Sequence, residues 1–326
     1  MSPNSCVVNH ACRSECIAAD DVVPRVSWPR YAVRQVGLLV THGFAIVFGF
    51  LSVFLTQRAT RRLLQVWARS VIRVAGIKVE IDGDFPRSGP MLVVANHVSF
   101  FDALAVLSRS SQIVPLATHQ VARSPIIGRM CRNAGAIFVN GTTPTAIPAM
   151  VRDVTTVLRT GHVVLAYPEG TPRCRAPGGP FPPAVLQCAI TANAPVQPVL
   201  TRCMLRDGTP TAQGCWFTYN EPATSMFRRV LRIRGLVIKI RIFPAIDPTV
   251  TRDRRDLAWV AKAPLDRTTG PMPHTCVAVT PKHEKPECSR DRDLTTQTGQ
   301  NSKNITPVLA SARAGKCGSE AGRLDL

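Results

Sequence analysis

The sequence has little of what marks RNA-binding and zinc-finger proteins. Its 326 residues include 3 Tyr and 12 Phe, and no segment interleaves aromatic and basic residues as RNA-binding segments do. No two cysteines form a Cys-x-x-Cys pair, which excludes the common zinc-finger spacing. Acidic residues are also scarce, with 21 Asp and Glu against 40 Lys and Arg. An interpretation as a nucleic-acid-binding protein would therefore rest on charge alone.

The positive charge is concentrated in the part of the chain that we expect to fold. Residues 1–251 carry 27 Lys and Arg and 12 Asp and Glu, which accounts for most of the formal net charge of +19. Such a surface attracts polyanions, either nucleic acid or an anionic membrane face. Since nucleic acid is the weaker choice, we expect a membrane lipid surface as a partner and no nucleic acid.

The eleven cysteines predict neither a disulfide framework nor a metal site. Their number is odd, and those within apolar sequence are scattered, which is typical of free thiols in a reducing compartment. Near the N-terminus three more lie close to a histidine, but the spacing of Cys6, His10, Cys12 and Cys16 matches no zinc pattern. The cysteines in apolar sequence are Cys131, Cys174, Cys188, Cys203 and Cys215.

Composition divides the chain into four segments. Residues 1–35 are polar and irregular, and residues 36–75 hold a long apolar run followed by a basic helical pattern. Residues 76–250 alternate between strand-like and helix-like runs. Residues 251–326 form a C-terminal extension, which turns polar after 271 and is expected to be mostly disordered there.

Residues 37–55 read GLLVTHGFAIVFGFLSVFL and contain no formal charge. This is about the length needed to cross ~30 Å of hydrocarbon, although three glycines and His42 also fit a buried or interfacial hairpin. More arginines follow the run than precede it, so we expect the rest of the chain to face the cytoplasm. The pattern leaves open whether the run spans the membrane or lies in it.

Residues 61–75, RRLLQVWARSVIRVA, place apolar residues at helical spacing with arginines between them. The pattern predicts an amphipathic helix with a basic face. Such a helix suits a headgroup surface, and it suits equally a helix whose apolar face packs in a protein core.

Residues 76–250 predict a single α/β domain with a mixed, largely buried β-sheet flanked by helices, preceded by the membrane-associated helical segment. The clearest helix is 148–160, which has Pro148 at its start and Gly161 after its end. Its alternation with apolar strand-like runs is typical of this fold class. The predicted strands are 77–81, 92–95, 113–117, 136–139, 163–167, 196–200, 216–219 and 237–243.

The segment NHVSFFD, residues 96–102, follows a predicted strand, at the end where α/β proteins usually place their sites. A carboxylate beside an imidazole makes a general base, because the acid fixes the tautomer and stabilises the imidazolium that forms. His97 and Asp102 are therefore candidates for catalysis, and a structural hydrogen bond between them is the alternative. We interpret Ser99 as a cap of the following helix.

Three further segments follow in order. They are GAIFV at 135–139, YPEGT at 167–171 and the proline-flanked strand APVQPV at 194–199. Four such segments, in this order and at these distances, resemble the glycerolipid acyltransferase family, whose best-known members are the 1-acylglycerol-3-phosphate (lysophosphatidate) acyltransferases. The resemblance covers about residues 60–250.

The resemblance implies an O-acyltransferase. It would transfer a fatty acyl group from acyl-CoA or acyl-carrier protein to the free hydroxyl of a lysophospholipid, in the main case 1-acylglycerol-3-phosphate, giving phosphatidic acid. His97 would deprotonate that hydroxyl and Asp102 would orient His97. No acyl-enzyme is implied, so the cysteines are not expected to be nucleophiles, and neither a metal nor a cofactor is implied. The residues that match substrate-binding positions are Asn96, Glu169, Gly170, Thr171, Arg173 and Pro198.

Two departures from the family pattern bear on the acceptor. The second motif usually ends in an arginine that helps to bind phosphate, and this chain has Asn140 there. In the third motif Pro172 intervenes before Arg173. An asparagine replaces a bidentate guanidinium poorly. Two alternatives follow: the acceptor is a phosphate-free lysolipid such as lyso-ornithine lipid, or the chain is a catalytically inactive relative that binds membranes.

Overall fold

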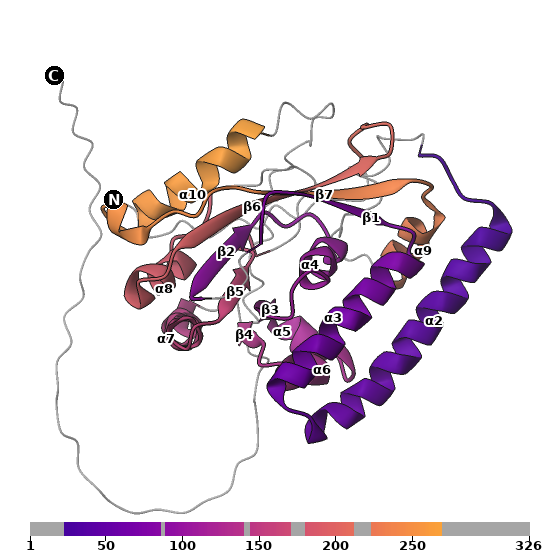
Figure 1. Cartoon of the computed structure of the whole chain (residues 1–326), viewed down its shortest axis with the longest axis horizontal. Coiled ribbons are helices and arrows are strands. Elements are labelled where there is room, and N and C mark those ends of the chain that lie inside the picture. Colours follow the sequence, from indigo (N-terminus) through magenta and orange to yellow (C-terminus); the bar gives the residue numbers. More distant parts are fainter. Residues whose placement is uncertain (1–22, 86–88, 140–143, 171–179, 212–222, 269–326) are drawn as a thin grey trace, which may run out of the picture. The chain divides into compact units, whose positions relative to one another are not determined.

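Seven strands form one sheet in the order β1-β7-β6-β2-β5-β3-β4 in the computed structural model, which describes residues 23–85, 89–139, 144–170, 180–211 and 223–268 (Figure 1). Strand β7 runs antiparallel to β6, while the other neighbouring strands are parallel. The sheet is therefore mixed, as predicted, and β2 lies between β6 and β5. The strands are β1 (Lys78–Asp82), β2 (Met91–Ala95), β3 (Ile113–Thr118), β4 (Ile137–Val139), β5 (Val163–Ala166), β6 (Val196–Leu205) and β7 (Leu236–Ile242).

The central strand β2 is apolar on both faces because helices cover both. Leu92 and Val94 belong to one hydrophobic core, Val93 and Ala95 belong to the other, and all four are fully buried. A strand buried on two sides is typically a continuous apolar run, which is why the sequence predicts this strand so clearly. One predicted strand, 216–219, lies outside the described residues.

Helices α3, α4, α6 and α9 cover one face of the sheet, and α7, α8 and α10 cover the other. Helix α7 corresponds to the predicted helix 148–160. Helix α10 adds Leu257, Ala261 and Leu265 to the second core, so the folded body continues past residue 250. The bounds are α3 (Gln57–Val74), α4 (Phe100–Leu107), α5 (His119–Arg123), α6 (Ile127–Asn133), α7 (Ile147–Arg159), α8 (Ala184–Ala192), α9 (Ala223–Arg232) and α10 (Arg254–Thr268).

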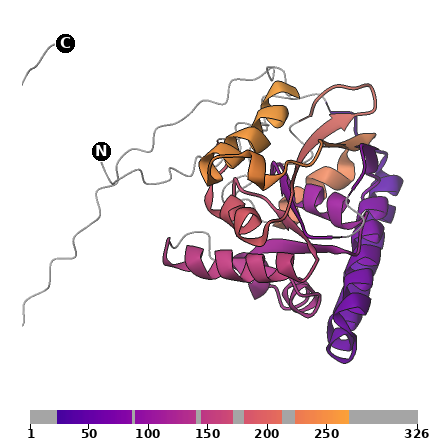
Figure 2. The ribbon, with the colours of Figure 1, turned by 60° about the vertical axis from the view of Figure 1, so that its left-hand side comes forward.

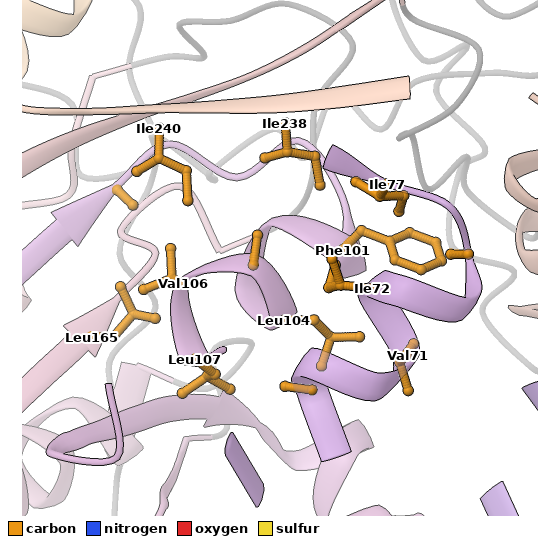
Figure 3. Packing of buried hydrophobic residues seen from close by; sticks show 14 of the residues in the cluster. Val71, Ile72, Ile77, Phe101, Leu104, Val106, Leu107, Leu165, Ile238 and Ile240 are labelled. Atoms are coloured by element: carbon orange, nitrogen blue, oxygen red, sulfur yellow. The ribbon is translucent and has the colours of Figure 1, made fainter. Parts of the chain in front are cut away.

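Helix α3 contains the predicted amphipathic segment 61–75, and its apolar face packs in the first core. Leu64, Trp67 and Val71 are buried there. Figure 3 shows Val71 and Leu104 in the packing between α3 and α4. Of the two interpretations of this pattern, the structure supports the core-packed helix, because the apolar face is not open to a headgroup surface.

The apolar run at 37–55 belongs to a longer helix. Helix α2 (Trp28–Leu51) continues into a 3-10 turn, Ser52–Phe54, and together they are long and apolar enough to cross a membrane. Figure 2 shows α2 and α3 side by side along one flank of the α/β body. Many large apolar side chains of this segment stay exposed, including Leu39 at 72% and Phe54 at 86%. Exposed apolar surface of this extent marks a contact with lipid or with another protein.

Arg34 links α2 to the α/β body through hydrogen bonds. Its Nη1 atom donates hydrogen bonds to the backbone oxygens of Leu231 and Ile233 at 2.9 and 2.8 Å. Gly76 leaves room for this guanidinium, because a Cβ atom at that position would lie 2.0 Å from Nη2 of Arg34. Gly76 also has a φ of +69°, which residues other than glycine rarely adopt.

Replacing Gly76 with alanine should lower the free energy of unfolding by about 2–4 kcal/mol, because alanine is strained at this φ and Arg34 must give up charge-assisted hydrogen bonds. Gly161→Ala is the matched control, since φ is +80° there and nothing lies within 4 Å of the added Cβ. We expect the control to cost about 1 kcal/mol. Denaturant titration measures the free energy of unfolding of both variants. Equal losses of stability would show that Arg34 can move away from an alanine at position 76 without a free-energy cost.

Candidate active site

The predicted catalytic pair lies at the carboxyl end of β2, in the connection to α4. The Nδ1 atom of His97 is 3.1 Å from Oδ1 and 3.2 Å from Oδ2 of Asp102. Asp102 is fully buried, and the side chain of His97 is 17% exposed. Because Nδ1 faces the carboxylate, a neutral imidazole carries its proton on Nδ1 and its lone pair on Nε2. This is the arrangement of a general base with an orienting acid.

Asp102 also holds the start of α4. Its Oδ2 atom accepts hydrogen bonds from the backbone N–H groups of Val98 and Ser99 at 2.7 and 2.9 Å. In return, Ser99 Oγ accepts from the N–H of Phe101 at 3.1 Å, so the interpretation of Ser99 as a helix cap is confirmed. The backbone of α4 therefore fixes the carboxylate in one position, from which it reaches His97.

Asn96 attaches the same loop to the neighbouring strand β6. Its Nδ2 donates to the backbone oxygen of Thr201 at 2.9 Å, and its Oδ1 accepts from the N–H of Thr201 at 2.7 Å. The Asn96 side chain is fully buried, and both of its polar atoms are engaged with backbone. Any effect of Asn96 on substrate binding would therefore act through the position of His97.

Tyr167 belongs to this site, although its segment YPEGT was singled out without a role for the tyrosine. Its ring centroid lies 4.4 Å from that of His97, with an angle of 32° between the rings. The Tyr167 hydroxyl is buried and makes no hydrogen bond of standard geometry to a described residue. Burial, and then the charge of Asp102, raise the pKa of Tyr167 well above its usual value. Knowledge of the strand pairing would have predicted this contact, because β5 pairs with β2 and ends beside His97.

The ring of Tyr167, rather than its hydroxyl, should hold His97 in place. We expect Tyr167→Leu to lower kcat by about 10–100-fold with little change in KM, because the imidazole gains freedom to rotate away from its productive orientation. Tyr167→Phe keeps the ring and should stay within about twofold of wild type, since the lost hydroxyl makes no well-formed hydrogen bond. Steady-state kinetics decides this, and an equally severe loss in Tyr167→Phe would assign the role to the hydroxyl.

Glu169 and Gly170 continue from Tyr167. Glu169 is buried, at 8% exposed, and Gly170 has a φ of +75°. The N–H of Gly170 donates to the backbone oxygen of Tyr167 at 3.0 Å, which closes a tight turn. Two predicted substrate-binding residues that follow, Thr171 and Arg173, lie outside the described residues, as do the departures Asn140 and Pro172.

Pro198 is not brought together with His97. Along β6, Val196 and Leu200 face the core formed with α7, α8 and α10, and Pro198 shares their face because side chains alternate along a strand. Pro198 lines a recess of about 390 Å³ with residues of α10. Tyr167, whose ring lies against that of His97, packs against the core of the other face.

The cysteines that the structure describes are not placed for nucleophilic catalysis. Cys131 and Cys188 are free and buried, and burial raises the pKa of each thiol to about 12. Cys203 is disulfide-bonded, so the prediction of free thiols is wrong at this position. Cysteine spacing alone does not identify which cysteines pair. Among the described residues, no group of three His, Cys, Asp or Glu side chains could hold a metal ion, and residues 6–16 lie outside them.

Comparisons with known proteins find similar acyltransferases. Residues 76–202 match the family described as Acyltransferase. Lyso-ornithine lipid O-acyltransferase of Rhizobium meliloti is 30% identical over 146 residues, 45% of this chain and 50% of that protein, so the chain spans half the length of this relative. The 1-acyl-sn-glycerol-3-phosphate acyltransferase of Neisseria meningitidis is 28% identical over 190 residues, 57% of this chain and 72% of that protein.

A solved structure has the same fold. The crystal structure of the 1-acyl-sn-glycerophosphate (LPA) acyltransferase, PlsC, from Thermotoga maritima aligns with a TM-score of 0.55 and 16% identity, covering 72% of this chain and 95% of that one. The matched segment includes both His97 and Asp102. Residues 76–202 therefore form an acyltransferase domain similar to that of the glycerolipid acyltransferases.

Proposed function

We propose that this chain is a membrane-associated O-acyltransferase that transfers a fatty acyl group from acyl-CoA or acyl-carrier protein to the hydroxyl of a lysophospholipid. The observation that carries the proposal is the His97–Asp102 pair, with Nδ1 3.1 Å from the buried carboxylate and Nε2 left to accept a proton. The reaction needs the acyl thioester as a co-substrate and no further cofactor.

In the proposed mechanism Nε2 of His97 takes the proton of the acceptor hydroxyl as the oxygen attacks the thioester carbonyl. A C–O bond forms, the C–S bond breaks, and the imidazolium returns the proton to the leaving thiolate. Asp102 stabilises the imidazolium between these two steps. General-base action of this kind contributes about 10²–10⁴-fold. Positioning of the two substrates supplies a further part of the rate.

The main acceptor that we propose is 1-acylglycerol-3-phosphate, with phosphatidic acid as the product. A second acceptor, lyso-ornithine lipid, is favoured by a specific observation: Asn140 stands where the family usually has a phosphate-binding arginine. The Rhizobium meliloti relative is named for that acceptor. We propose further that the exposed apolar helix α2 holds the enzyme in the membrane, with the α/β body on the cytoplasmic side.

An acceptor comparison tests this proposal. Membranes containing the chain receive long-chain acyl-CoA with either 1-acylglycerol-3-phosphate or lyso-ornithine lipid, and the released thiol is measured. We expect release to depend on the acceptor and to be faster with 1-acylglycerol-3-phosphate. Faster release with lyso-ornithine lipid would reverse the order of the two acceptors. If no thiol is released with either acceptor, whether acyl-CoA or acyl-carrier protein is the donor, the result would support an inactive membrane-binding relative.

A further inference from the structure

The first two turns of α3 carry positive charge that no ion pair among the described residues neutralises. Arg58, Arg61 and Arg62 lie there, and the first turn contains no acidic residue. The amino end of a helix already carries a positive partial charge, so cations at this end are unfavourable. An anion bound there would offset both the arginines and the helix dipole.

Arg61 is the unusual member of this group. It is 7% exposed, and it makes no hydrogen bond or ion pair with another described residue. Burial, and then the charge of Arg58, lower the pKa of Arg61. The two other arginines whose pKa burial lowers both have partners: Arg34 donates to two backbone oxygens, and Arg109 donates to the backbone oxygen of Val79. Arg61 has no such partner, and none of its nitrogen atoms is among the buried polar atoms left unpaired, so its donors reach solvent where an anion can bind them.

His162, just before β5, lies within electrostatic range of Arg61 and Arg58. Its Nδ1 atom lies 2.9 Å from the hydroxyl of Thr160. Burial, and then the charges of Arg61 and Arg58, lower the pKa of His162. His162, in the turn between α7 and β5, therefore lies within electrostatic range of the two guanidinium groups of α3. Guanidinium groups bind phosphate oxygens through paired N–H donors, so this set suits a phosphate group.

An exposed apolar tip precedes these cations in the chain. Val53, Phe54 and Leu55 are 63%, 86% and 40% exposed. At the same end of α2, the guanidinium of Arg129 lies 5.3 Å from the ring centroid of Phe50. Apolar side chains next to cations are typical of a segment at a membrane interface, where the cations lie at the level of the lipid phosphates. The tip favours a lipid phosphate over a phosphate in solution.

We propose that Arg61, with Arg58 and His162, binds the phosphate group of an anionic phospholipid at the turn between α2 and α3. The site is separate from the catalytic pair. His162 precedes the amino end of β5, whereas His97 follows the carboxyl end of the parallel strand β2. The proposal does not depend on acyl transfer, because it concerns how the body is held at the membrane.

The test compares Arg61→Met with Arg62→Met in the full chain. Arg62 is exposed and adjacent in the same helix, so its replacement removes the same charge. Binding is measured by co-sedimentation with vesicles of mixed phosphatidylcholine and phosphatidylglycerol. Arg62→Met should weaken binding about fivefold through the lost general attraction. Arg61→Met should weaken it by about tenfold more, because direct charge-assisted hydrogen bonds are also lost. Equal losses in the two variants would overturn the proposal.

Thermal unfolding in a non-ionic detergent distinguishes a ligand-binding role of Arg61 from a role in stabilising the fold. Without lipid, Arg61→Met should raise the unfolding midpoint, because the methionine keeps the packed stem and removes a charge that partial burial disfavours. A lowered midpoint would show that Arg61 stabilises the fold, and this would overturn the proposal. Short-chain phosphatidylglycerol should raise the midpoint of wild type but not that of Arg61→Met. An equal rise with inorganic phosphate would assign the site to a soluble anion, against the proposal.

Discussion

An Asp102→Asn variant should lose about 10²–10⁴-fold in kcat while remaining folded. In the native protein, the backbone N–H groups of Val98 and Ser99 both donate to one oxygen of Asp102. Asparagine has a single acceptor oxygen, which these two donors would occupy. Its amide N–H₂ would then face Nδ1 of His97. A donor at that place forces Nδ1 to accept, so the imidazole proton moves to Nε2 and the base can no longer take a proton.

The measurement is kcat in mixed micelles, together with the thermal unfolding midpoint. Since the amide oxygen of asparagine can keep both backbone donors, we expect a stability loss of no more than about 1 kcal/mol. Asp153→Asn, at an exposed acid that pairs with Arg152, is the control and should keep the wild-type rate. If Asp102→Asn kept most of the activity, Asp102 would be a helix cap without a role in catalysis.

Replacing His97 with alanine should lower kcat by a similar factor of about 10²–10⁴, because the acceptor hydroxyl loses the group that takes its proton. Asp102 keeps its two backbone donors in this variant, so the start of α4 should stay formed. His119→Ala is the matched control, since His119 is exposed at the start of α5.

The double variant His97→Ala/Asp102→Asn gives a sharper result. If Asp102 acts only by orienting His97, removing both should cost no more than removing His97 alone. Losses that multiply would show that Asp102 contributes to catalysis by a second route. Steady-state rates of the four proteins in one detergent preparation are sufficient.

Much of the sheet could be predicted from the sequence because its central strands are buried on both faces. Such strands are uninterrupted apolar runs, and β2 and β5 were predicted to within a residue or two. The antiparallel direction of β7 could not be predicted, because an apolar run is the same in either direction. Helix α10 was not among the predicted elements, because charged residues interrupt its apolar positions.

The candidate site shows where sequence patterns stop being sufficient. His97 and Asp102 are close in sequence, so a loop and the first turn of one helix bring them together, and the motif alone predicted their contact. Tyr167 reaches His97 only through the pairing of β5 with β2, which requires the strand register. Pro198 follows the other motifs in order, yet alternation along β6 turns it to the opposite face.

The pattern of α3 had two interpretations because amphipathicity does not specify what covers the apolar face. The structure supplies that information: α3 packs between α4 and α2, with the ring of Trp67 edge-on to that of His42, while α2 leaves many of its own apolar residues exposed. A sequence-based prediction could name a membrane-associated segment, but it could not say which of two adjacent helices exposes the apolar surface.

The most direct test of the central claim is a balance of products from the purified chain. Acyl-CoA and 1-acylglycerol-3-phosphate are supplied together, and the released thiol and the diacylated lipid are both measured, with His97→Ala in parallel. Direct transfer by His97 predicts equal amounts of thiol and diacylated lipid from wild type, thiol release that stops when the acceptor is omitted, and neither product from the variant. Thiol release without acceptor, or diacylated lipid formed by His97→Ala at the wild-type rate, would contradict it.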